Sequence, residues 1–146
     1  MGRRALRDGR FAMSQVGSRF SLSAVPGRVR VLFEGHEVAD SARTLALTET
    51  GRKPVFYFPR EDVQMSVLKA NGHVTINADL GRAAWFTIMR DAKIVEDVAW
   101  AYDQPIGEAE LIAGYVSFRP EHVEFETEGL VNPVLHVPPM DPPYAD

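Results

Sequence analysis

Residues 57–62, which read Tyr-Phe-Pro-Arg-Glu-Asp, hold the side chains best suited to bind a charged ligand. A guanidinium at the end of an aromatic strand can bind a carboxylate or phosphate through two parallel hydrogen bonds. Arg60 is therefore a candidate for holding an anionic group, with Tyr57 and Asp62 beside it. The alternative is structural, with Arg60 paired to a neighbouring acid and Asp62 capping backbone amides.

A second group lies in residues 96–102, where Trp100 and Tyr102 are separated by one residue. Alternate residues of a strand share a face, so both rings point to the same side. Their apolar bodies and polar tips suit the wall of a ligand site, and they suit the edge of a core equally well. Glu96 and Asp97 point to opposite faces of a regular strand, so they do not form an acid/base pair locally.

Two further arrangements come from separate segments. Paired catalytic carboxylates would have to converge in space, and Glu49 and Asp62 are the candidates, with any catalytic role unknown. In residues 77–82, Gly81-Arg82 follows Asp79 and could form a small anion-binding turn. A simple hairpin loop is the alternative for that segment.

Several chemistries are excluded by what the chain lacks. It contains no cysteine, which removes disulfides, thiolate nucleophiles and cysteine-ligated zinc. Its four histidines have no metal-motif spacing, so we expect no metal and no cofactor. The phosphate-binding loop, the dinucleotide-binding glycine motif, the zinc-protease motif and the nucleophile-elbow motif are all absent.

Charge is distributed unevenly along the chain. Residues 1–28 carry six arginines and one aspartate, a net +5, which leaves −9 for the rest of a chain whose total is −4. An acidic body disfavours nucleic acid as a partner, and contact through the arginine-rich arm is the alternative. No apolar run is long enough for a membrane span or a secretory signal, so we expect a cytoplasmic protein. The arginine- and serine-rich start leaves an organelle transit peptide as a minor alternative.

The elements that must position these residues are predicted to be short strands of a mainly β fold. We expect order to begin after Pro26-Gly27 and a hairpin turn at Glu34-Gly35-His36-Glu37. Asn71-Gly72 predicts another turn, and Glu96-Asp97 a bulge. Alternation and β-branched or aromatic content favour strands over residues 29–33, 44–48, 54–58, 73–76, 83–89, 93–102, 115–118 and 122–127, and a further strand that starts at Val38.

Short helices are predicted after Pro59 and over residues 105–113, where acids in the first turns and Gly114 at the end favour one. The chain then divides into three parts. Residues 1–28 form a basic, flexible arm, residues 29–128 a single β domain, and residues 129–146 a proline-rich extended tail.

An ordered set of motifs resembles the domain of unknown function 427 family and covers about residues 29–128. The motifs are Val29-Arg30-Val31 with Gly35, Val38-Ala39-Asp40-Ser41, Arg43, Leu45, Glu49, Tyr57 to Val63, Gly81 with Ala83, Asp97 with Ala99-Trp100 and Tyr102, Pro105, and Ile112 to Val116 with Phe118.

The resemblance implies a β-tent-like fold of small coiled antiparallel sheets with one or two short helices. Members are sometimes labelled nucleotidyltransferase-like, yet the glycine-serine and paired-aspartate pattern of such enzymes is missing here. Many members resemble Cys-Pro-x-Lys-Gly where this chain has Asn77 and Leu80 in place of the cysteine and lysine. Any chemistry done by that thiol or amine is lost in this chain, and Arg82 is a positive charge nearby.

These patterns favour a small soluble domain that binds a small, anionic ligand in a polar and aromatic pocket, by a reaction still unknown if it is an enzyme. The ligand-binding candidates are Glu49, Tyr57, Arg60, Asp62, Trp100 and Tyr102. The alternative is a non-catalytic protein-interaction module that uses an edge strand or the proline-rich tail, and a homodimer is a candidate assembly.

Overall fold

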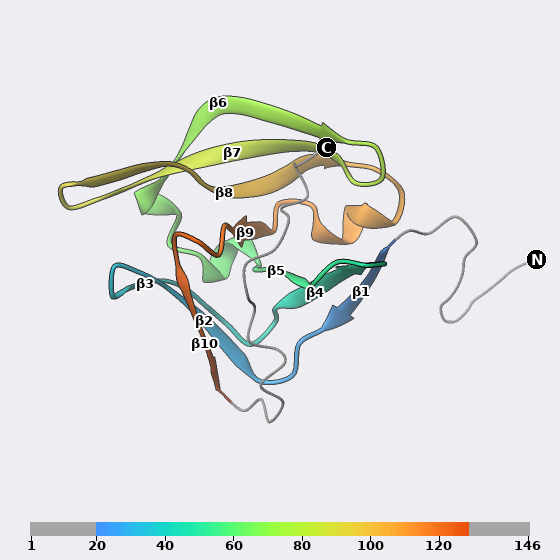
Figure 1. Ribbon diagram of the computed structural model, residues 1–146, viewed down its shortest axis with the longest axis horizontal. Helices are drawn as coiled ribbons and strands as arrows, with labels where there is room; N and C mark the ends of the chain where they lie inside the picture. The colour runs from blue at the N-terminus through green and yellow to red at the C-terminus, as the bar shows by residue number, and fades with distance from the viewer. Residues whose placement is uncertain (1–19, 129–146) are drawn as a thin grey trace, which may run out of the picture.

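Three small antiparallel sheets make up the computed structural model, which describes residues 20–128 (Figure 1). One sheet has the order β1-β4-β5, with β1 Phe20–Ala24, β4 Leu45–Glu49 and β5 Val55–Tyr57. A second has the order β10-β2-β3, with β10 Glu124–Glu128, β2 Arg28–Phe33 and β3 His36–Ser41. The third has the order β6-β7-β8-β9, with β6 Leu68–Asn77, β7 Gly81–Arg90, β8 Lys93–Pro105 and β9 Val116–Phe118.

Three short 3₁₀ helices connect these sheets. They are η1 Arg60–Asp62, η2 Met65–Val67 and η3 Gly107–Ile112. A single antiparallel bridge between Phe58 and Val116 joins the end of β5 to β9, and another joins Ala39 to Val63. The sheets are therefore tied to one another by backbone hydrogen bonds as well as by packing.

The interior divides into two hydrophobic cores. The first core consists of Val25, Val29, Val31, Phe33, Val38, Ala39, Ala46, Phe56, Phe58, Val63, Leu68, Phe86, Ile88, Val98, Ala99, Ala101, Val116, Phe118 and Val123. The second core consists of Leu47, Val55, Tyr57, Leu80, Ala83, Trp85, Trp100, Tyr102, Ala109 and Ile112. The first core therefore draws on the β10-β2-β3 side of the molecule and the second on the β1-β4-β5 side.

Strand β8 is buried on both faces over residues 98–102. Ala99 and Ala101 point into the first core, whereas Trp100 and Tyr102 point into the second. The prediction that these two rings share a face is confirmed, because strand side chains alternate between faces. Strand β5 behaves in the same way, with Phe56 in the first core and Tyr57 in the second.

Several local predictions are also confirmed. The fold is mainly β, and the hairpin turn between β2 and β3 lies within the predicted residues 34–37, at Glu34-Gly35, where both residues have positive φ angles of 51° and 81°. This pair of angles matches the right-handed twist of the flanking strands. The bulge predicted at Glu96-Asp97 is present as a register shift between β7 and β8.

Other predictions are wrong in instructive ways. Order begins before Pro26-Gly27, because β1 pairs with β4 along its whole length within the stretch expected to be a flexible arm. Asn71-Gly72 does not reverse the chain but lies inside β6. The helix predicted over residues 105–113 is confirmed but is shorter, because Pro105 ends β8 and the helix is the six-residue 3₁₀ helix η3. Residues 1–19 and the proline-rich tail lie outside the described residues.

Among residues 20–128, no helix is long and apolar enough to cross a membrane. The longest helix within that range, η3, spans six residues.

Gly81 at the start of β7 is the glycine whose replacement should cost most. Its φ is +114°, and an added Cβ would lie 2.3 Å from the backbone oxygen of Gln104. We expect Gly81→Ala to lower the free energy of unfolding by about 3 kcal/mol in urea denaturation. Gly35→Ala is the control, because φ there is +81° but an added Cβ meets nothing within 4 Å. It should cost only about 1 kcal/mol, and equal losses in the two variants would contradict the steric argument.

Candidate functional site

The structure divides the six candidate residues among three places. Tyr57, Trp100 and Tyr102 lie in the second core, and the charge of Glu49 acts on the Tyr57 hydroxyl. Asp62 lies in a network with Ser41 and Arg43 near the end of β3, and Arg60 lies against the loop that follows η3.

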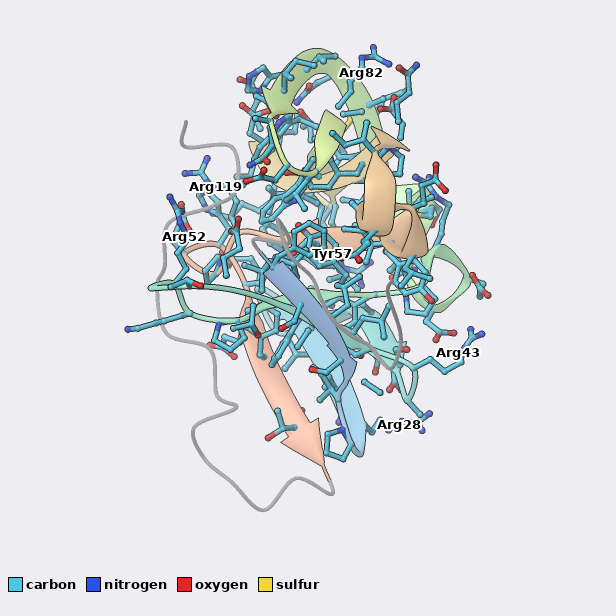
Figure 2. All side chains as sticks on the ribbon, turned by 90° about the vertical axis from the view of Figure 1, so that its right-hand side faces the viewer. Arg28, Arg43, Arg52, Tyr57, Arg82 and Arg119 are labelled. Carbon is cyan, nitrogen blue, oxygen red and sulfur yellow. The ribbon has the colours of Figure 1, made fainter. Side chains whose placement is uncertain are left out.

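The three candidate rings contact one another in the interior. The ring centroids of Tyr57 and Trp100 are 6.3 Å apart and nearly perpendicular, and those of Tyr57 and Tyr102 are 6.4 Å apart. The Trp100 indole N–H donates to the Tyr57 hydroxyl at 3.2 Å. All three side chains are at most 1% exposed. They form part of a hydrophobic core, which is the alternative that the sequence left open, and Figure 2 shows Tyr57 in the middle of the molecule.

Burial also sets the ionisation of Tyr57. Desolvation raises the pKa of its hydroxyl well above the ordinary value, and the nearby Tyr102 and Glu49 add to this rise. The hydrogen bond from Trp100 acts in the opposite direction. Tyr57 therefore stays neutral in the folded protein over the physiological pH range.

Asp62 holds two elements together. Its carboxylate accepts hydrogen bonds from the Ser41 hydroxyl at 2.7 Å and from the Arg43 guanidinium at 3.2 Å. The Ser41 hydroxyl is buried and accepts from the Arg43 backbone amide at 2.9 Å. Glu61 also pairs with Arg43, and these two carboxylates raise the pKa of the guanidinium. Asp62 thus binds side chains at the end of β3 and in its connection to β4 rather than capping backbone amides.

Arg60 is exposed and faces a different part of the molecule. Its Nε donates to the backbone oxygen of Gly114 at 3.2 Å, and its guanidinium carbon lies 5.8 Å from the centre of the Phe86 ring. Figure 2 shows labelled arginines such as Arg43 and Arg82 reaching outward, with Tyr57 in the middle of the molecule. Arg60 and Asp62 therefore do not share a space with the three aromatic candidates.

The segment of residues 77–82 is a structural turn. The Asn77 side-chain oxygen accepts from the backbone amides of Asp79 and Leu80 at 2.8 and 3.0 Å. These amides are thereby occupied, which supports the hairpin interpretation over an anion-binding turn. Leu80 is fully buried in the second core, and Arg82 pairs with Asp103 at 3.0 Å.

A different group of polar residues is brought together by two bulges on either side of β7. On β6, residues 71–73 lie opposite the single residue Trp85, between the pairs Ala70–Phe86 and Val74–Ala84. On β8, residues 96–98 lie opposite the single residue Thr87, between Phe86–Ala99 and Ile88–Val95. Bulges are often found beside functional sites, because they redirect side chains.

Five residues define this bulge site: Asn71, His73, Trp85, Thr87 and Asp97. The His73 ring stacks on Trp85 with centroids 5.5 Å apart, and its Nδ1 lies 3.2 Å from an Asp97 carboxylate oxygen. The Asn71 amide nitrogen donates to the other Asp97 oxygen at 2.9 Å and to the Thr87 hydroxyl at 3.0 Å. The Asn71 side-chain oxygen accepts from the His73 backbone amide at 2.9 Å.

The bulge site combines exposed polar groups with a buried ring. The side chains of His73 and Asp97 are 45% and 31% exposed, whereas Trp85 is buried and donates its indole N–H to Thr75. The ring centroids of Trp85 and Trp100 are 5.1 Å apart, so the site lies at the rim of the second core. An imidazole held by a carboxylate can exchange a proton or a hydrogen bond with a bound molecule.

Sequence reasoning identified only part of this site. It predicted the bulge at Glu96-Asp97 but gave Asp97 no role, and it assigned Asn71 to a turn. The available signal was the alternation along β6, in which Lys69, Asn71, His73, Thr75 and Asn77 are polar. Over the described part of the chain, no three histidine, aspartate or glutamate side chains group as metal ligands would.

The raised pKa of Tyr57 predicts a pH dependence of stability. Above about pH 10 the unfolded chain loses this proton while the folded chain keeps it, so the stabilising contribution present at lower pH is lost. The melting temperature of Tyr57→Phe should therefore fall less than that of the wild type between about pH 9 and 11. Thermal unfolding across this range measures it, with the half-buried Tyr115→Phe as control. Identical alkaline losses in both variants would count against the assignment.

The Asp62 network predicts a stability effect of its own. Ser41→Ala removes the buried hydroxyl that links Asp62 to the backbone of Arg43, and should cost about 1–2 kcal/mol in chemical denaturation. Glu61→Gln alters an exposed member of the same network and should change stability by less than about 0.5 kcal/mol. If the serine variant is as stable as the glutamine variant, the network is not structural.

Comparison with known proteins agrees with the motif pattern found in the sequence. A family model described as a domain of unknown function, DUF427, matches residues 21–129, from the second residue of β1 through β10. A search of curated proteins found no match. With about three quarters of its length covered by that model, the chain belongs to the DUF427 family.

Proposed function

We propose that this domain binds a small ligand at the bulge site. The observation that carries the proposal is that two separate bulges, one on each neighbour of β7, direct Asn71, His73 and Asp97 to one position over Trp85. Each bulge leaves backbone groups outside the ladder, which costs stability. The partly exposed ion pair between His73 and Asp97 adds too little stability to offset this loss. A role beyond stability is therefore the better explanation.

The surroundings of the site favour an anionic or hydrogen-bonding ligand of small size. Lys69 lies opposite Thr87 in the register of β6 and β7, and directly opposite residues share a face of the sheet. Among the described residues, Lys69 has no carboxylate in ion-pair range. Its ammonium can therefore meet an anionic group while His73 contacts a neighbouring donor or acceptor.

The candidates read from the sequence take supporting roles in this proposal. Tyr57, Trp100 and Tyr102 form the aromatic cluster against which Trp85 packs. Glu49 adds to the rise in the pKa of Tyr57 within that cluster. Arg60 and Asp62 lie outside the bulge site and hold loops in place. The ligand would thus contact the edge of the aromatic cluster rather than enter it.

A thermal-shift screen of the full chain with nucleotides, sugars and carboxylates tests this proposal. A ligand that binds the folded state raises the melting temperature. Any compound found should bind His73→Ala at least about tenfold more weakly, a loss of about 1.4 kcal/mol. His36→Ala is a matched control, because the His36 side chain is 46% exposed against 45% for His73.

The outcome also decides between this proposal and an interaction module. Strand β6 is an edge strand, with Val74 and Ile76 37% and 66% exposed, and such an edge can accept a partner strand. Equal binding to both histidine variants would place the ligand elsewhere. No stabilisation by any compound, together with concentration-dependent association of the chain, would favour the interaction module.

A further inference from the structure

The contacts of His73 determine which of its ring nitrogens can accept a proton. Nδ1 lies 3.2 Å from the Asp97 carboxylate, which can only accept a hydrogen bond when ionised. The neutral tautomer that this contact favours therefore has its proton on Nδ1 and its lone pair on Nε2. Within the described residues Nε2 contacts no hydrogen-bond partner, so its lone pair is available to a bound molecule.

The carboxylate that fixes this tautomer is itself fixed. Its second oxygen accepts from Asn71 at 2.9 Å, and the backbone of Asp97 has a φ of +57° set by the bulge. The imidazole plane is held in turn by its stacking on Trp85, at an angle of 25°. A base whose orientation and tautomer are both set by neighbours is the arrangement used for general-base catalysis.

We propose that His73 is a general base for a hydroxyl, water or amine group of the molecule bound at the bulge site, with Asp97 as its positioning residue. The inference rests on the proposed ligand site. In the step, the Nε2 lone pair takes the proton, and the electron pair of the broken O–H or N–H bond stays on the oxygen or nitrogen. Asp97 stabilises the imidazolium, which later returns the proton to the product.

The charged groups around His73 are consistent with this role. Asp97 from β8 contacts the ring directly, and Lys69 from β6 lies on the same face opposite Thr87. His36 offers a contrast at almost the same exposure. Its Nδ1 lies 2.9 Å from an Arg90 guanidinium nitrogen and its Nε2 lies 3.7 Å from Asp91, so both ring nitrogens face charged side chains.

Carbethoxylation by diethyl pyrocarbonate tests the assignment without a known ligand. The Nε2 lone pair attacks a carbonyl carbon of the reagent and expels ethyl carbonate, so the rate reports the availability of that lone pair. In full chains that keep only one histidine, His73 should react at least about tenfold faster than His36 near neutral pH. Equal exposure of the two side chains removes access as an explanation.

Asp97→Asn sharpens the test, because asparagine tolerates the same positive φ. Its amide can donate to Nδ1, which moves the ring proton to Nε2, so the His73 rate should fall at least about tenfold. Asp103→Asn is the matched control on the same strand, and it should keep the rapid reaction. Unchanged reactivity in Asp97→Asn would overturn the positioning role.

A measurement on the unmodified chain covers the case in which Asp97→Asn does not fold. Long-range ¹H–¹⁵N spectra, recorded at a pH where the ring is neutral, should show His73 protonated on Nδ1. A proton on Nε2 would overturn the inference.

Ligand binding that depends on His73, without fast carbethoxylation, would overturn the role of His73 as a general base and leave the proposed ligand site standing. Fast carbethoxylation with no ligand in the screen would remove the ligand site instead.

Discussion

Burial of β8 on both of its faces is the constraint on which the rest of the structure depends. Small side chains, Ala99 and Ala101, face the first core, and large rings, Trp100 and Tyr102, face the second. A shift of one residue in its register would exchange methyl groups for indole and phenol rings in both cores at once. Packing in the two cores is therefore sufficient to fix how residues 98–102 of β8 pair with β7, without a contribution from surface residues.

This fixed register explains where the bulge site forms. Phe86 pairs with Ala99 and Ile88 pairs with Val95, so three residues of β8 must fit opposite one residue of β7. The surplus is accommodated at residues 96–98, which turns Asp97 across β7 toward the residues of β6. A similar surplus on β6 turns Asn71 and His73 toward it. Packing in the interior thus determines the meeting point of polar groups at the rim.

Local sequence signals were sufficient where one strand alone decides the geometry. The shared face of Trp100 and Tyr102 and the Glu34-Gly35 turn follow from alternation and from backbone preference. Asn71-Gly72 predicted a turn, whereas the structure has a bulge there. A turn and a bulge can require the same positive φ, and only the pairing with β7 distinguishes them. Whether Tyr57 and Trp100 line a ligand site or a core depends on segments more than forty residues apart, which no local pattern encodes.

The two bulges meet the same backbone requirement with different residues, and this difference connects the fold to the proposed site. Gly72 adopts a φ of +86° on β6, where glycine bears no steric cost, whereas Asp97 adopts +57° on β8. The other non-glycine residues with positive φ in the described chain, Glu34 and Asp91, lie in hairpin turns. Glycine would relieve the strain at position 97 but would remove the carboxylate. That carboxylate joins Asn71 to His73, and together with the Trp85 ring it orients the partly exposed imidazole.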